Sequence, residues 1–355
     1  MMETTKDLLL SLIMEGARQN RQEGFGLFKG DMGVCLALFV LNREKKDPVV
    51  EDFADNLIDR IYARAAKEKN AFFDTGFAGI GWGINYLMEN HYYEGDVDEV
   101  LKDIDAAVFK EINTVSGIPA NVSNGLLGYL IYSVARLGNP GHVRNTVLHE
   151  IDKDFLRELI VRIDRSSPTI FSSICKDEYF TLLWHVPLLL VLLRGTLNLS
   201  VFNDKIINMV KTWLFYLETN QPYLHINKLY LAVSLAYLNG YLRFPEIKKR
   251  IEVLMFSVDL SKIEDELDTR IMNINDGWFG AVAILKKAED LLDRDVPNYG
   301  LLRETRIKIL EKYGALFDDY VNDSHREKPL DISFVHGLSG IGFLLFLWPE
   351  AFSGV

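Results

Sequence analysis

The chain has 355 residues, 48% of them hydrophobic, so it can bury a large core. Its 39 basic and 50 acidic residues give a formal net charge of −11, which opposes non-specific binding to nucleic acid or to an anionic membrane. The two cysteines, Cys35 and Cys175, form no C-x-x-C motif, which excludes a disulfide framework and favours a reduced, cytoplasmic compartment.

The first residues, MMETTKDLLLSLIMEGARQ, predict an amphipathic helix, because acidic residues precede the apolar stretch and no small-residue cleavage site follows. The longest apolar run, Leu182 to Leu193, contains His185 and Pro187 and is shorter than the ~20 residues of a membrane span. We find no Gly/Ser-rich linker or low-complexity tract that would mark a domain boundary. The sequence therefore predicts one domain over residues 1–355, with no membrane span.

A Gly-x-x-Gly pair that opens an apolar run recurs along the chain. The five clear copies are Gly30 and Gly33, Gly76 and Gly79, Gly125 and Gly128, Gly277 and Gly280, and Gly337 and Gly340. The gap of 152 residues between Gly125 and Gly277 (277 − 125) is close to three ordinary steps. Two worn copies are therefore predicted near residues 176 and 226, where apolar segments begin at Tyr179 and His225. The chain then holds seven repeats.

Amphipathic segments lie between the glycine-led runs. They are residues 4–22, 48–67, 96–114, 149–164, 203–219, 245–258 and 299–321. The glycine-led runs are apolar on nearly all sides, so they must be buried, and strand signals are scarce. The first and last copies are as apolar as the others, which favours a closed ring over an open array with polar caps. The sequence predicts an all-α (α/α)7 toroid, with seven inner Gly-x-x-Gly helices inside seven outer helices.

The two glycines in each inner helix require an explanation, because each lowers helix stability by about 1 kcal/mol relative to alanine. Without a Cβ, they allow a neighbouring backbone or a ligand to approach the start of the helix closely. All inner helices of such a ring run the same way, so their N-termini gather at one end. Unpaired N–H groups and helix dipoles there would favour anionic or carbonyl groups of a ligand. We therefore expect a ligand-binding cup at that end.

The residue before each first glycine is expected on the floor of this cup. These residues are Lys29, Thr75, Asn124, Asp276 and His336. Thr, Asn and Asp are favoured helix N-caps, so a structural role explains three of them. Lys29 and His336 do not cap an N-terminus, and a neutral histidine suits a general base, a metal ligand or a core hydrogen bond.

Circular order would make the sixth, seventh and first repeats neighbours in a closed ring. Asp276, His336, Lys29 and Asp31 could then converge. His185, which lies in the worn fourth copy, either faces the cavity or packs in the core. A nucleophile elbow, a Walker loop and clustered cysteine ligands are absent from the sequence.

Phrases such as GFAGIGWGINYLM and HGLSGIGFLLFL, repeated with paired outer helices, resemble the LanC-like family over essentially the whole chain. The resemblance implies a seven-fold (α/α) toroid. It also implies a lanthionine synthetase, which adds a cysteine thiol to a dehydroalanine or dehydrobutyrine of a ribosomal peptide. In such enzymes a zinc ion lowers the thiol pKa, so that thiolate is available at neutral pH.

This sequence departs from the family pattern at the zinc ligands. The family has a cysteine before the fifth glycine pair, where Ile226 stands here, and Cys-His before the sixth, where Asn275 and Asp276 stand. A family histidine before the third pair corresponds to Asn124, and the acidic residue before the second pair is Asp74, which stands nearer the glycine than the family pattern places it. Asn and Ile cannot replace two thiolates, so no zinc or other cofactor is expected.

We therefore interpret the chain as a divergent LanC-like protein that binds, or helps a partner enzyme to modify, a ribosomal peptide, with the zinc-dependent cyclase activity lost. The candidate catalytic residues are His336, Asp276 and Asp74. The candidate substrate-binding residues are Lys29, Asp31, Thr75, Asn124, His185 and Asn227. One alternative is an active enzyme with a non-standard site, either a peptide cyclase or a glycan-processing enzyme. Another is a rearranged zinc site formed by His225, Asp276 and His336.

Overall fold

A computed structural model describes residues 2–19, 24–65, 67, 70–142, 146–175, 179–323 and 330–352. Within these ranges the regular structure comprises fourteen α-helices and short 3-10 turns, and the β-structure is limited to an isolated bridge between Gly24 and Gly30. The prediction of an all-α protein is confirmed. None of the helices in this described part of the chain is both long and apolar enough to cross a membrane.

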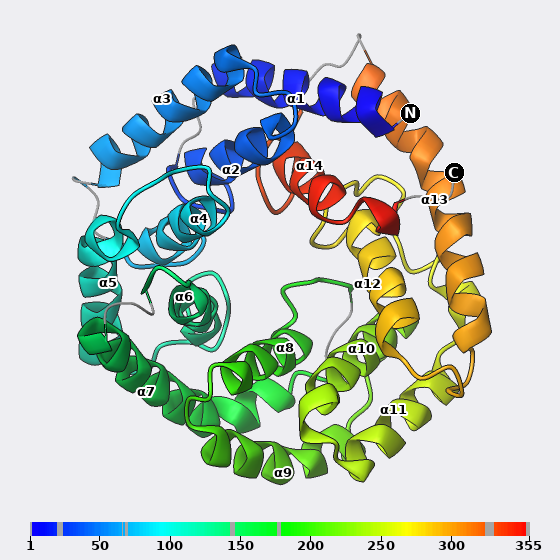
Figure 1. Cartoon of the computed structure of the whole chain (residues 1–355). Helices are drawn as coiled ribbons and strands as arrows, with labels where there is room; N and C mark the ends of the chain where they lie inside the picture. Colours follow the sequence, from blue (N-terminus) through cyan, green and yellow to red (C-terminus); the bar gives the residue numbers. More distant parts are fainter. Residues whose placement is uncertain are drawn as a thin grey trace. The chain divides into compact units, whose positions relative to one another are not determined.

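The helices alternate between the two predicted kinds (Figure 1). The amphipathic ones are α1 (Met2–Gln19), α3 (Pro48–Ala65), α5 (Val97–Thr114), α7 (Thr146–Phe171), α9 (Asn203–Thr219), α11 (Pro245–Ser257) and α13 (Leu302–Asn322). The apolar ones are α2 (Asp31–Asn42), α4 (Phe77–Glu89), α6 (Leu126–Gly138), α8 (His185–Asn198), α10 (His225–Leu242), α12 (Trp278–Leu291) and α14 (Leu338–Leu347). The largest difference from the prediction is the start of α8, expected near residue 176.

The chain divides into two compact units. Unit 1 comprises Met1–Arg162 and His325–Leu347, and unit 2 comprises Ile163–Ser324 and Trp348–Val355. Helix α7 begins in unit 1 and ends in unit 2. The expectation of a single domain over residues 1–355 stays a prediction.

Unit 1 has two layers of helices. Its inner helices pack in the order α14, α2, α4 and α6, so that α14 from the end of the chain lies beside α2 from its start (Figure 1). Helix α1 covers α14 and α2, α3 covers α2, and α5 covers α4. Every residue of α2 is buried, whereas α3 buries only Val50, Ala54, Leu57 and Ile61. The division into buried inner and half-exposed outer helices is therefore present within this unit.

Unit 2 repeats the arrangement with α8, α10 and α12 packed in that order. Helix α9 covers α8, α11 covers α10, and α13 covers α12. The buried Arg306 of α13 pairs with Glu289 of α12 at 2.6 Å and donates to the carbonyl oxygen of Ala351 at 2.7 Å. This guanidinium therefore fixes the last segment of the chain to the outer layer.

The glycines allow the preceding loop to fold back onto the start of its own inner helix. A Cβ on Gly79 would lie 1.9 Å from the carbonyl oxygen of Phe73, and one on Gly128 would lie 2.1 Å from that of Val122. Both distances are far inside van der Waals contact. Backbone, rather than a ligand, therefore makes the close approach at these two positions.

Candidate functional site

Four loops of unit 1 lead into its inner helices, and we call them together the loop row. They are residues 24–30, 70–76, 119–125 and 331–337. Each loop caps the helix that it precedes through a carbonyl seven residues before the first helical N–H. The bonds are Asp31 N to Gly24 O at 3.2 Å, Phe77 N to Asn70 O at 2.9 Å, Leu126 N to Pro119 O at 2.8 Å, and Leu338 N to Asp331 O at 2.8 Å. The first N–H group of each of these four helices is therefore paired with backbone, contrary to the expectation of unpaired N–H groups.

Backbone hydrogen bonds join the four loops to one another. Phe334 N donates to Phe28 O at 2.9 Å, and Phe28 N donates to Asp74 O at 3.0 Å. Phe73 N and Asp74 N both donate to Ser123 O, at 2.9 and 3.0 Å. The loop row is therefore continuous from the last glycine phrase through the first and second to the third.

The loop row carries five of the predicted site residues. The side chains of Lys29, Thr75 and Asn124 are exposed, and those of Asp74 and His336 are half-buried. Thr75 Oγ1 donates to the Asp74 carboxylate at 3.0 Å, which orients the two side chains together. The structure thus places five polar side chains from four sequence-distant phrases on adjacent loops.

The interpretation of Thr75, Asn124 and Asp276 as helix N-caps is wrong. The N-cap residues are Gly76, Gly125 and Gly277, and none of the three helices receives a side-chain cap. Asparagine oxygens act earlier in these loops instead, because Asn70 Oδ1 accepts from Phe72 N at 2.8 Å and Asn121 Oδ1 accepts from Asn124 N at 3.0 Å. The side chain of Asn124 therefore does not cap the N-terminus of α6.

Asp31, the first residue of α2, has a different environment from these five residues. Its side chain is 1% exposed and accepts two hydrogen bonds from Arg60 of α3, at 2.5 and 3.2 Å. Such a bidentate pair satisfies the buried carboxylate and ties α3 to the start of α2. Substrate binding by Asp31 stays a prediction.

In unit 2, residues 179–184 lie against the start of α10 and the loop before α12, and we call them the covering segment. Asn227 Nδ2 donates to Tyr179 O at 3.2 Å, and Leu182 N donates to Asn275 O at 2.7 Å. Thr181 Oγ1 donates to Asn275 Oδ1 at 2.7 Å. The covering segment thus joins the fourth and sixth repeats directly, across the start of the fifth.

The contacts of Asn275 lie at one of the positions, Ile226, Asn275 and Asp276, at which the family resemblance places zinc ligands. Ile226 is fully buried and has no donor atom, and the amide oxygen of Asn275 already accepts from Thr181 and from Leu183 N. Among the residues that the structure describes, no three His, Cys, Asp or Glu side chains are placed to hold a metal ion. Zinc prefers thiolate and imidazole, so the residues at these positions do not fit it.

Other polar groups near the start of α10 also have hydrogen-bond partners within the protein. The Glu266 carboxylate accepts from His225 N at 2.8 Å and from Ile226 N at 2.9 Å, so an internal anion satisfies this helix N-terminus. His225 Nδ1 accepts from Asp259 N at 2.9 Å. The rearranged zinc set that includes His225 draws residues from both units and stays a prediction.

The remaining predicted residues of unit 2 differ in how well their polar atoms are satisfied. His185 is the first residue of α8 and is half-buried, and burial lowers the pKa of its imidazole, which favours the neutral form. Asn227 is 1% exposed, and its Oδ1 atom has no partner within the described part of the chain. Asp276 is half-buried, and its N–H donates to Asn273 Oδ1 at 3.0 Å.

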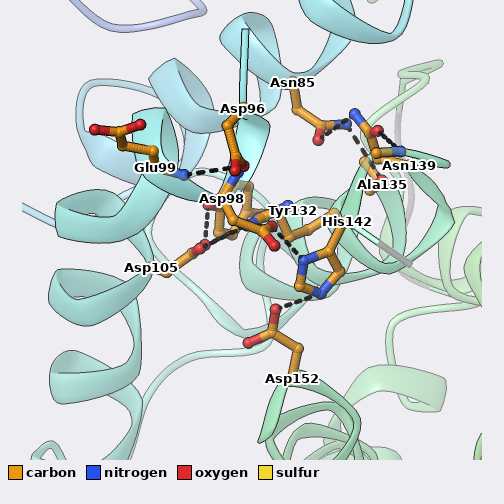
Figure 2. Close-up of polar contacts among 12 residues, drawn as sticks. Asn85, Asp96, Asp98, Glu99, Asp105, Tyr132, Ala135, Asn139, His142 and Asp152 are labelled. Carbon is orange, nitrogen blue, oxygen red and sulfur yellow. Dashed lines mark hydrogen bonds and ion pairs between the residues drawn. The ribbon is translucent and has the colours of Figure 1, made fainter. Parts of the chain in front are cut away.

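A buried network of charges in unit 1 was not predicted (Figure 2). Arg136 of α6 is 2% exposed and pairs with Asp98 at 2.6 Å and Asp105 at 3.1 Å, both from α5. The fully buried His142 lies between Asp98, at 2.6 Å from Nδ1, and Asp152 of α7, at 2.9 Å from Nε2. Three carboxylates therefore surround two basic groups.

Hydrogen bonds within the network shift the pKa values of its carboxyl and imidazole groups. Burial alone would raise the pKa of the Asp98 carboxyl, but hydrogen bonds from His142 and Arg136 lower it overall. Burial alone would lower the pKa of His142, but its hydrogen bonds with Asp152 and Asp98 raise it. His142 is not accessible to solvent, so we assign the network a structural role that joins α5, α6 and α7. The seven-residue spacing of Asp98 and Asp105, on one face of α5, is the only local signal for it.

Comparisons with known proteins agree with this architecture. The family model described as lanthionine synthetase C-like protein matches residues 21–179. Among solved structures, a nisin cyclase is similar with a TM-score of 0.63 and 13% sequence identity, over 98% of this chain and 94% of that one. A search of curated proteins found no match. At this identity the structural match shows the fold alone, which is the (α/α) toroid that the sequence predicts.

Proposed function

Because residues 21–179 match the lanthionine synthetase C-like family model and the fold matches that of nisin cyclase, we propose that the chain binds a ribosomally made peptide at the loop row, without zinc-dependent thioether cyclisation. The observation that supports the proposal is the continuity of the loop row, whose hydrogen-bonded loops carry the exposed residues Lys29, Thr75 and Asn124. The similarity to nisin cyclase supports a peptide as the ligand class.

The chemistry of the loop row suits an extended peptide. Thr75 and Asn124 offer hydroxyl and amide groups that can pair with peptide N–H and C=O groups, and Lys29 offers a cation for an acidic side chain. The backbone bonds between the loops hold these groups in place before binding, which lowers the entropy lost on association. Asp74 and His336 are close enough to solvent to act on a bound peptide.

The residues at the positions of the family's zinc ligands support the proposal that zinc-dependent cyclisation does not occur. Ile226 supplies no donor atom, and Asn275 holds the covering segment instead. A cysteine thiol has an ordinary pKa of about 8.5, so only a few per cent is thiolate at neutral pH without a metal. The protein would therefore hold a peptide, or present it to a separate peptide-modifying enzyme.

Peptides selected on the full chain from a phage-displayed library of random sequences provide the test. Selected peptides should bind Lys29→Ala and Asn124→Ala at least tenfold more weakly than the unchanged protein, a loss of about 1.4 kcal/mol, measured by fluorescence anisotropy. Lys102→Ala, at an exposed position of α5, is the matched control and should bind normally. Peptides that bind all three variants equally would place the site away from the loop row.

A further inference from the structure

A cavity lies at the other end of α2 and α4, away from the loop row. Its volume is about 380 Å³, within the usual range for small-molecule sites. Residues from the end of α2, the start of α3 and the segment after α4 line it. The twelve residues of α2 span about 18 Å, so this cavity is separate from the loops before Gly30 and Gly76.

One wall of the cavity is aromatic. Phe39 packs against Tyr92 and Tyr93, with ring centroids 5.9 and 5.2 Å apart. The Tyr93 hydroxyl donates to the Asp55 carboxylate, which fixes the position of that ring. This wall can accept an aromatic or branched aliphatic side chain of a ligand.

Charged groups of both signs line the same cavity. The Arg43 guanidinium lies 5.3 Å from the centre of the Tyr92 ring, and Lys46 follows it on the same turn. Glu51, from the first turn of α3, supplies a carboxylate. The side chains of Lys46 and Glu51 form no ion pair or hydrogen bond with any residue that the structure describes. Opposite charges thus line one cavity without neutralising each other.

The backbone also contributes partial charge to the cavity. Both α2 and α4 end at the cavity, and helix C-termini carry partial negative charge that favours cations. After α4 the chain turns tightly, with Tyr92 N donating to Leu87 O at 2.8 Å and His91 N to Met88 O at 3.1 Å. His91 takes a positive φ of 59° in this turn, which directs the following tyrosines back toward α2. A ligand ammonium group would be stabilised between these helix ends and Glu51.

We infer that this cavity binds the free zwitterion of an amino acid with an aromatic or large aliphatic side chain. Arg43 and Lys46 hold the carboxylate, Glu51 holds the ammonium group, and the side chain packs against Phe39 and the two tyrosines. The inference is independent of peptide binding at the loop row, because the two sites share no residue.

Calorimetric titration of the full chain with L-phenylalanine and L-leucine tests the ligand class. N-acetyl-L-phenylalanine lacks the ammonium group and L-phenylalaninamide lacks the carboxylate, so each should bind at least tenfold more weakly than L-phenylalanine. The dipeptide Phe-Leu, whose charges are farther apart, should also bind more weakly. Failure of both free amino acids to bind at millimolar concentration, or equal binding of the blocked forms, would overturn the inference.

Charge-removing variants test the assigned residues. Glu51→Gln should weaken L-phenylalanine at least tenfold, yet leave the weak binding of N-acetyl-L-phenylalanine unchanged, because that analogue no longer needs the carboxylate. Lys46→Gln should show the same pattern with L-phenylalaninamide. Glu99→Gln and Lys102→Gln, both at exposed positions of α5, are matched controls that should bind normally. Losses that do not depend on the matching ligand group would also overturn the assignment.

Discussion

The start of α10 in unit 2 is built differently from the starts of the inner helices in unit 1. In unit 1, each glycine-led loop folds back on its own helix and bonds to the next loop, which leaves side chains such as Lys29 and Thr75 exposed. In unit 2, α10 has no glycine pair, its first N–H groups are held by Glu266, and the covering segment crosses it to reach Asn275. At α10, where the glycine pair is missing, a distant carboxylate and the covering segment take the place of the glycine-led loop.

The largest expected effect comes from breaking the loop row at one of its glycines. Gly79→Ala would place a Cβ 1.9 Å from the Phe73 carbonyl oxygen, so the loop must move, at a cost of about 3 kcal/mol in the free energy of unfolding. Gly314→Ala in α13 is the matched control, because nothing lies within 4 Å of its Cβ. It should stabilise the protein by about 0.5 to 1 kcal/mol. Urea unfolding that moves the same way in both variants would refute this role of the glycines.

An intermediate effect is expected from uncapping α10 in unit 2. Glu266→Ala removes the acceptor of two backbone N–H groups, which should lower the free energy of unfolding by about 1 to 2 kcal/mol. Glu252→Ala, at an exposed position of α11, should change it by less than about 0.5 kcal/mol. Equal values for the two variants in urea unfolding would show that Glu266 does not replace the missing loop.

The smallest effect is a pH dependence of stability that belongs to unit 1. The carboxylates of Asp98 and Asp152 raise the pKa of His142, so its contribution is complete below the ordinary value of 6.5 and is lost as pH rises through the folded pKa. The lowered pKa of Asp98 acts in the opposite direction at acid pH. The destabilisation caused by His142→Gln should therefore be larger at pH 5.5 than at pH 8.5 in urea unfolding. A pH-independent difference would show that folding does not raise the pKa of His142, and a larger destabilisation at pH 8.5 would show that burial keeps it neutral.

Local periodicity predicted the layers of the fold well, because residues close together in the sequence determine the apolar face of a helix. The prediction of α9 as residues 203–219 agrees with the structure, and that of α10 from His225 does too. The start of α8 was missed because the preceding residues are held by Asn275, a contact more than 90 residues away. No local pattern encodes such a partner.

The site was predictable only in part, for related reasons. The repeat placed Lys29, Thr75, Asn124 and His336 at equivalent positions, and the structure puts them on adjacent loops. Their surroundings were not predictable, since the caps come from backbone carbonyls rather than side chains. The buried pairing of Arg136 with α5 was missed because its charges resemble the exposed face of an ordinary amphipathic helix. The convergence of Asp276 with His336 stays a prediction.

Zinc content tests the central claim most directly. Untagged protein, purified without added metal and then dialysed against zinc followed by metal-free buffer, would be analysed by elemental mass spectrometry. The account predicts far less than one zinc per chain, because Ile226, Asn275 and Asp276 stand where the family resemblance places two cysteines and a histidine as zinc ligands. One tightly held zinc per chain would contradict the account and direct mutagenesis to His225, Asp276 and His336.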